Sequence, residues 1–156
     1  MSSRANALAL LFDRDLATLR TELEGYADEA GVWTLRPGIS NSAGTLVLHL
    51  TGNLKHFVGA SLGGTGYVRD RDAEFGDRDM PRQALLERID ETREVVGRTL
   101  GSLEDAALDR PFPGKGPPAL GDAPTSGALL TYMYGHFAYH LGQVNYHRRL
   151  LGEPGR

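Results

Sequence analysis

Apolar side chains recur at spacings of three and four residues in four separate stretches of this 156-residue chain. That spacing places them on one face of an α-helix, so we expect helices over about residues 5–30, 41–62, 81–103 and 124–151. We expect Gly31 to end the first helix, and residues 40–42 and 124–126 are suited to begin the second and the fourth. No stretch shows the alternation that is typical of a β-strand. The pattern predicts an all-α protein.

Two long connections separate these helices. Residues 63–80 include a charged run, Arg69, Asp70, Arg71, Asp72 and Glu74. We interpret this run as solvated or internally salt-bridged surface in preference to a set of substrate contacts. Residues 104–124 are rich in proline and glycine and cannot form a regular helix, so we expect a surface loop or lid that borders a site. The length of the chain fits one domain over residues 1–156.

Composition narrows the possible chemistry. The chain has no cysteine, so disulfides, thiolate ligands and a cysteine nucleophile are all excluded. The net charge is -3, and the charges are interspersed without a basic footprint, so we expect neither nucleic acid nor a membrane as a partner. No apolar run reaches the roughly 18 residues of a membrane span, and the N-terminus lacks the apolar core of a signal peptide. We therefore expect a cytoplasmic protein.

Five histidines are the candidate metal ligands. His136 and His140 are four residues apart and about 6 Å along the helix axis, so both can bind one ion. His147 lies about 10.5 Å beyond His140, too far to share it, and His56 is equally far from His49. One histidine of the second helix must therefore complete the site, and spacing does not choose between His49 and His56.

Two amides lie close to these histidines along the helices. Asn53 comes one turn after His49, and Gln143 is close to His140. Each is suited either to orient an imidazole from the outer shell of a metal site or to bond to backbone or solvent. The small residues Gly135, Ala138 and Gly142 line another face of the fourth helix and permit close helix contact, within the bundle or across a dimer.

Three segments resemble the DinB-like (YfiT-like) superfamily of metal-binding four-helix bundles. They are residues 46–54 around His49, residues 67–75 with the charged run, and residues 136–146 with the His-x-x-x-His pair. The resemblance implies an all-α four-helix bundle with long crossover connections, commonly a homodimer. It also implies one divalent ion, often nickel or zinc, on His49, His136 and His140, with His56 and His147 left as packing or outer-shell residues.

Three imidazoles leave coordination positions open, which is typical of a catalytic or ligand-exchanging ion. Relatives implied by the resemblance include thiol S-transferases, so our leading hypothesis is a transferase that joins a low-molecular-weight thiol to a small-molecule substrate. One alternative is a metal-dependent hydrolase, although no acid/base carboxylate lies on the histidine-bearing faces. The other is a metal-binding stress-response protein that is not an enzyme.

Overall fold

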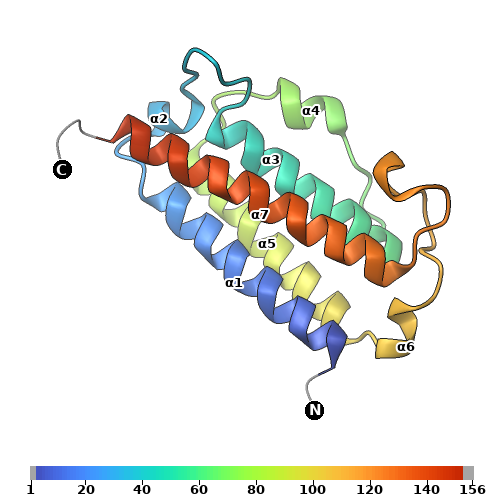
Figure 1. Ribbon diagram of the computed structural model, residues 1–156. Helices are drawn as coiled ribbons and strands as arrows, with labels where there is room; N and C mark the ends of the chain where they lie inside the picture. Colours follow the sequence, from blue (N-terminus) through green and yellow to red (C-terminus); the bar gives the residue numbers. More distant parts are fainter. Residues whose placement is uncertain (1–2, 153–156) are drawn as a thin grey trace.

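Four long helices lie side by side in the computed structural model, which describes residues 3–152 (Figure 1). They are α1 (Arg4–Glu24), α3 (Ala43–Leu54) with its π-helical continuation η1 (Lys55–Leu62), α5 (Arg82–Gly101) and α7 (Ser126–Leu151). Shorter segments connect them: α2 (Glu29–Trp33), α4 (Arg71–Gly76), α6 (Asp105–Leu108) and the 3-10 turn η2 (Pro118–Leu120). No strand occurs within the described residues. The predicted all-α bundle is confirmed.

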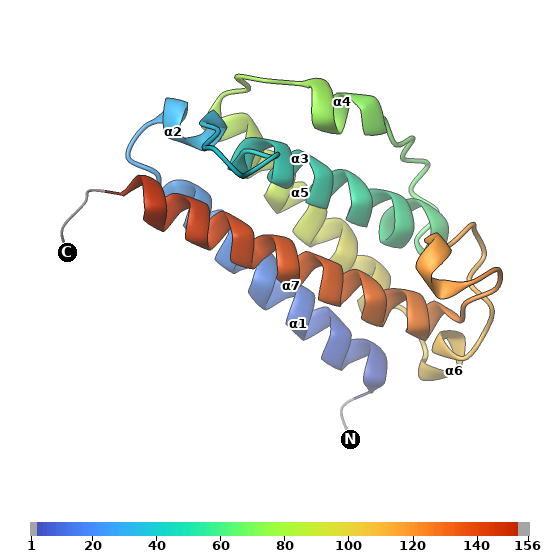
Figure 2. The same ribbon diagram turned by 45° about the horizontal axis from the view of Figure 1, so that its top comes forward.

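The first and second long helices, α1 and α3, occupy opposite corners of the bundle, and so do the third and fourth, α5 and α7. α1 packs on α5 and α7, and α3 packs on the same two helices. The two views show that α3 and α5 run in the same direction, antiparallel to α1 and α7 (Figures 1 and 2). The chain must therefore return along the whole bundle between η1 and α5, and on this return α4 packs against α3. The connection between α5 and α7 stays at one end of the bundle.

The first helix ends earlier than expected. α1 stops at Glu24, and the prediction of a continuous helix to residue 30 was wrong. The Asp28 side chain accepts a hydrogen bond from the backbone N–H of Gly31 at 2.7 Å and begins α2, so Gly31 lies inside that helix. Aspartate favours this capping position over the interior of a helix, which explains the break.

The core is formed by all four long helices. Its largest fully buried side chains include Phe12, Leu16, Leu50, Ile89, Leu129 and Phe137. Every residue of α3 is buried, because α4 covers the side that would otherwise face solvent. His49 lies within this buried helix, and its exposed fraction is only 6%. Within the described residues, no helix combines the length and the apolar character needed to cross a membrane.

Candidate metal centre

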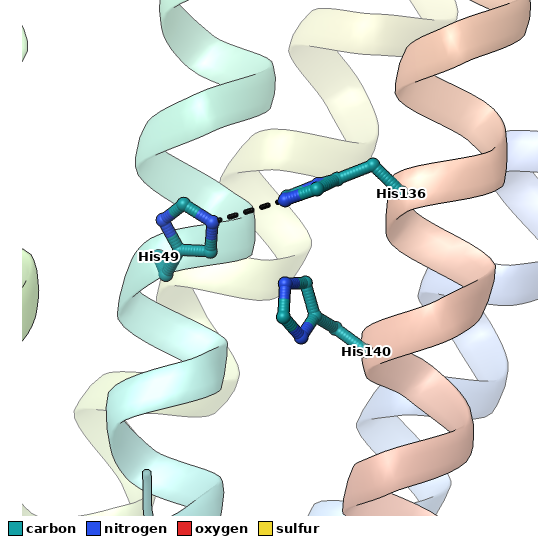
Figure 3. A group of neighbouring side chains, drawn as sticks. All are labelled: His49, His136 and His140. Carbon is teal, nitrogen blue, oxygen red and sulfur yellow. Dashed lines mark hydrogen bonds between the residues drawn. The ribbon is translucent and has the colours of Figure 1, made fainter. Parts of the chain in front are cut away.

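His49, His136 and His140 converge between α3 and α7 (Figure 3). One ring nitrogen from each lies within 4.8 Å of the others, and the Nε2 atoms of His49 and His136 are 3.2 Å apart. Nitrogen ligands about 2.0–2.1 Å from a tetrahedral ion are roughly 3.3 Å from one another. The His49–His136 pair already has this separation, whereas the larger spread of the set means that at least one imidazole must turn inward to bind an ion.

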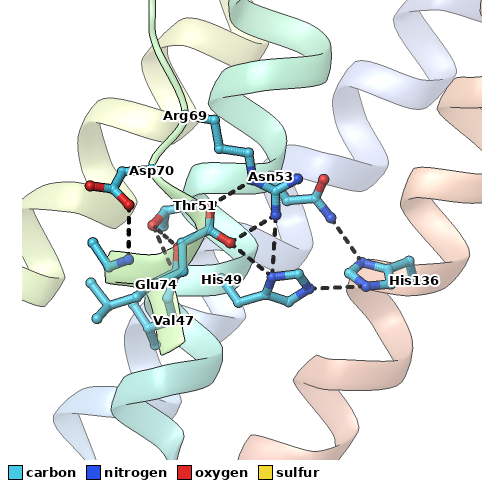
Figure 4. Close-up of polar contacts among 10 residues, drawn as sticks. Val47, His49, Thr51, Asn53, Arg69, Asp70, Glu74 and His136 are labelled. Carbon is cyan, nitrogen blue, oxygen red and sulfur yellow. Dashed lines mark hydrogen bonds and ion pairs between the residues drawn. The ribbon is translucent and has the colours of Figure 1, made fainter. Parts of the chain in front are cut away.

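The Nδ1 atom of His49 is held from the far side by Glu74 of α4. Glu74 Oε2 lies 3.1 Å from Nδ1, and both carboxylate oxygens accept hydrogen bonds from Arg69, at 2.6 and 2.8 Å (Figure 4). Arg69 also lies 3.4 Å from Nδ1, but arginine only donates, so the Nδ1 proton belongs to the shorter contact with the carboxylate. With Nδ1 donating to Glu74, Nε2 is the nitrogen that faces the centre.

Glu74 is buried and ionised. Burial by itself raises the pKa of its carboxyl group, but the hydrogen bonds from Arg69 and His49 outweigh it, and the net effect lowers the pKa. Within the charged run, Arg69 and Glu74 therefore form an internal salt bridge, and Glu74 is not part of a solvated surface.

A glycine makes room for this carboxylate. Gly52 lies on α3, three residues after His49, and a Cβ atom there would be 2.2 Å from Glu74 Oε1. Any other residue at position 52 would push Glu74 away from α3. The contact of the Glu74 carboxylate with His49 depends on this missing side chain.

The other two imidazoles have amide partners. His140 Nδ1 lies 2.6 Å from Gln143 Oε1, so it donates to the amide oxygen and leaves Nε2 free. Asn53 Nδ2 lies 3.3 Å from His136 Nδ1, while Asn53 Oδ1 is buried without a hydrogen-bond partner. Asn53 had been expected near His49, but its side chain reaches His136 on the neighbouring helix.

The orientation of the Asn53 amide determines how His136 can act. As placed, Asn53 donates to Nδ1, which leaves the proton of a neutral His136 on Nε2. Turning the amide by 180° satisfies the orphaned Oδ1 with the Nδ1 proton and frees Nε2 for an ion. Oxygen and nitrogen of an amide are interchanged by this turn at almost no steric cost. All three Nδ1 atoms then have an acceptor, the arrangement that commonly orients metal-binding histidines.

The two half-buried histidines are neutral at physiological pH. Burial, reinforced by the neighbouring His140 and His49 and by Arg69 and Arg71, lowers the pKa of His136 to about 4. Burial also lowers the pKa of His140, against the opposing hydrogen bond with Gln143. Imidazole binds metal only in its neutral form. His136 and His140 therefore fit a divalent transition metal without competition from protons at pH 7.

The remaining two histidines lie outside the cluster. His147 is buried in the core, with Nδ1 at 2.6 Å from the Tyr26 hydroxyl and Nε2 at 2.8 Å from the Thr34 carbonyl. Both of its ring nitrogens are satisfied, so it packs and does not bind metal. His56 stacks its ring edge on Phe57, with centroids 4.8 Å apart, and faces a cleft beside the cluster.

This cleft has a volume of about 460 Å³ and reaches His49 and His136 at its inner end. Its size lies in the range of roughly 300–1,000 Å³ that is usual for small-molecule sites. The proline- and glycine-rich connection contributes Lys115 and residues 116–118 to its wall, so this connection borders the site as expected. The cleft gives small molecules a path to the histidine cluster.

Sequence reasoning did not find Glu74 as the partner of His49. The contact joins residues 25 positions apart and exists only because α4 folds over α3. The available signal was Gly52, a glycine in the middle of a strongly apolar helix, which indicates a close approach by another segment.

Comparison with known families agrees with this arrangement. A search of curated proteins gives no significant match. The family model of the DinB superfamily matches residues 11–144, a range that includes all three clustered histidines together with Glu74, Asn53 and Gln143. The match spans most of the chain, and this protein therefore belongs to the DinB superfamily.

Proposed function

We propose that this protein is a metal-dependent enzyme that transfers a small thiol to an electrophilic small-molecule substrate. The observation that carries the proposal is the convergence of three imidazoles whose Nδ1 atoms each face a hydrogen-bonding partner and whose other nitrogens face one centre beside an open cleft. We propose His49, His136 and His140 as the ligands of one nickel or zinc ion. Asn53, Gln143 and Glu74 are the residues that orient them.

A divalent ion on three imidazoles supplies Lewis acidity and lowers the pKa of a thiol or water that binds it. The protein holds the imidazoles in place through Glu74, Asn53 and Gln143, and its cleft admits the reactants from one side. In the transfer, the thiol loses its proton, a sulfur–carbon bond forms, and the leaving group departs with its electron pair. The thiol must come from solution because the chain has no cysteine, and the cytoplasm is where such thiols are kept reduced.

Hydrolysis is the second candidate, and one observation favours it. His56 lines the cleft, and burial together with the charge of Arg69 lowers the pKa of His56, so its imidazole is neutral and able to accept a proton from water at pH 7. The one buried carboxylate beside the cluster, Glu74, is already paired with Arg69 and His49 and is not free to act as a base. Thiol transfer needs no such base once the thiol is ionised.

Metal analysis of protein purified without chelating resin tests the ligand set. Variants His49→Gln, His136→Gln and His140→Gln are each expected to lose the ion, while the matched controls His56→Gln and His147→Gln retain it. Retention of the ion by all three ligand variants would refute the proposed centre. Loss of the ion from His56→Gln would place that residue among the ligands.

The reaction is tested by consumption of an activated chloroarene in the presence of a panel of small thiols. Turnover is expected with the nickel- or zinc-loaded protein and not with the metal-free protein or with His49→Gln. Turnover of ester or amide substrates without thiol would favour the hydrolase instead. If neither reaction occurs and removal of the ion unfolds the protein, the non-enzymatic metal-binding alternative is favoured.

We also propose that two copies pair through the outer face of α7. A Cβ atom at Gly135 or Gly142 would meet nothing within 4 Å, so the small residues of this face contact no other part of the chain. Tyr139 and Tyr146, on the same face, are each 66% exposed. Sedimentation should give a dimer for the wild type and a monomer for Gly142→Arg, and a monomeric wild type would contradict the pairing.

A further inference from the structure

The cleft beside the histidine cluster is lined by positively charged side chains and by no acidic ones among the described residues. Arg69, Arg71 and Lys115 contribute to its wall, and none of its lining residues, all within the described part of the chain, is Asp or Glu. This contrasts with the whole chain, whose net charge is -3. Such a concentration of one sign in a concave site favours a ligand of the opposite sign.

Two of the three cations are free to meet a ligand. Arg69 is bound by both oxygens of Glu74. Arg71 lies over the ring of Phe75 at 5.2 Å, and neither Arg71 nor Lys115 pairs with an acid among residues 3–152. Asp70 and Asp72 are neighbours of Arg71 in the chain, but they do not line the cleft, and the Asp70 carboxylate caps α4 by accepting from the Ala73 N–H at 2.9 Å.

The rest of the cleft is suited to a small organic molecule. Phe57, Met133 and Tyr132 give it an apolar part, and Met133 is buried while Arg71 and Lys115 are exposed. The cations therefore lie toward solvent, and the nitrogens of His49 and His136 lie at the inner end. Asn53, the amide partner of His136, also lines the cleft.

We propose that this cleft binds a small organic acid, with Arg71 and Lys115 holding its carboxylate while another group of the same molecule points toward the histidine cluster. The inference rests on the proposed function for the identity of that second group. The acid is carried either by the thiol or by the electrophile that the thiol attacks. The volume of about 460 Å³ is in the range that is usual for sites of small molecules.

The experiment uses full-length protein loaded with cobalt(II), whose visible spectrum changes when a thiol binds. In each of two pairs of thiols a carboxylate is exchanged for an uncharged hydroxyl group: 3-mercaptopropionate with 2-mercaptoethanol, and 6-mercaptohexanoate with 6-mercaptohexanol. The double variant R71Q/K115Q removes the two cations. The matched control R98Q/R110Q removes the same charge from exposed positions outside the cleft. Succinate binding is followed separately by calorimetry, with and without 2-mercaptoethanol, on metal-free and loaded protein.

If the thiol carries the acid, the wild type should bind the charged thiol of a pair about tenfold more tightly than the neutral one. This is the gain expected from one or two charged hydrogen bonds that are partly screened by solvent. R71Q/K115Q should lose this preference and keep its affinity for the neutral thiol, and R98Q/R110Q should retain it. If the electrophile carries the acid, the thiols of a pair bind alike, and succinate binds beside 2-mercaptoethanol with an affinity that falls about tenfold in R71Q/K115Q.

The two proposals fail in different ways. Equal binding of charged and neutral thiols, together with no cation-dependent succinate binding, overturns the acid site and leaves thiol transfer standing. Absence of any spectral change with thiols, while succinate still depends on Arg71 and Lys115, overturns thiol transfer and leaves the acid site standing. An equal loss in R98Q/R110Q would show a general charge effect and overturn the acid site.

Discussion

His49 Nδ1 lies 3.1 Å from Glu74 Oε2, although 25 positions of sequence separate the two residues. The contact links a histidine in the middle of a buried helix to a carboxylate on the short helix that covers it. Its consequence is that α4 is part of the proposed metal site, since it fixes the ring orientation of one proposed ligand.

Replacement of Glu74 by glutamine tests this link. The amide can still accept from His49, but it carries no charge and leaves Arg69 without its ion pair, so the affinity for the ion should fall by about 10- to 100-fold. Competition with a chromophoric chelator measures the dissociation constant of the ion from the protein. The exposed Glu87→Gln is the matched control and should bind as the wild type does. Unchanged affinity in Glu74→Gln would show that the carboxylate only stabilises the fold.

Gly52→Ala should displace Glu74 without altering any polar group. The added Cβ would lie 2.2 Å from Glu74 Oε1, so the carboxylate must move from its contact with His49, and both metal affinity and the free energy of unfolding should decrease. The matched control is Gly97→Ala, because a Cβ at this exposed helical position meets nothing within 4 Å. The control should gain about 0.5–1 kcal/mol in stability. A stabilised Gly52→Ala with normal metal binding would contradict the close packing of α4.

His147 should matter for stability and not for metal. Its Nδ1 accepts from the buried Tyr26 hydroxyl at 2.6 Å, so Tyr26→Phe leaves a buried nitrogen without a donor. We expect a loss of about 1–3 kcal/mol in the free energy of unfolding, measured with denaturant on metal-free protein. Metal stoichiometry should stay at the wild-type value. A change in stoichiometry would mean that the core around α2 contributes to the site.

Acid should destabilise the metal-free protein in a defined pH range. Folding lowers the pKa of His136 to about 4, chiefly through burial, whereas an unfolded histidine titrates near 6.5. Between these values the unfolded state binds more protons, so the free energy of unfolding should decrease as pH falls from about 6.5 toward 4, by at most about 1.4 kcal/mol per pH unit for this one group. Above pH 7, where the imidazole is neutral in both states, His136 should not contribute to the pH dependence of the free energy of unfolding.

Denaturant unfolding at several pH values between about 5.5 and 7 measures this slope in a range where ordinary carboxylates are largely ionised. His136→Gln should show a shallower slope than the wild type. Equal slopes would mean that His136 is not held in a buried, neutral state.

The features of this structure that could be predicted from the sequence are those that follow from helical periodicity. The His136–His140 pair follows directly from a spacing of four within a continuous apolar stripe, and it is found as expected in the cluster. The end of α1 was mispredicted because Tyr26 continues the apolar spacing while Asp28 begins a new helix by capping. Local hydrogen bonding outweighed the hydrophobic pattern at that point.

Neither the third proposed ligand nor the residues that orient the histidines could be derived from periodicity. His49 and His56 share one edge of the same helix, and the preference for His49 rested on the family resemblance. The structure places His49 Nε2 at 3.2 Å from His136 Nε2 and leaves His56 lining the cleft. Glu74 and Asn53 reach their histidines across helix–helix contacts, which a pattern within one helix does not contain.

The division of the three histidines between α3 and α7 has a consequence for the order of folding. His49 and His136 are 87 positions apart, and the pair on α7 follows α1, α3 and α5 in the chain. During synthesis the first three long helices are made before His136 and His140 of the cluster. The complete histidine cluster therefore forms only when α7 has docked, and uptake of an ion by the proposed site would report that the bundle is closed.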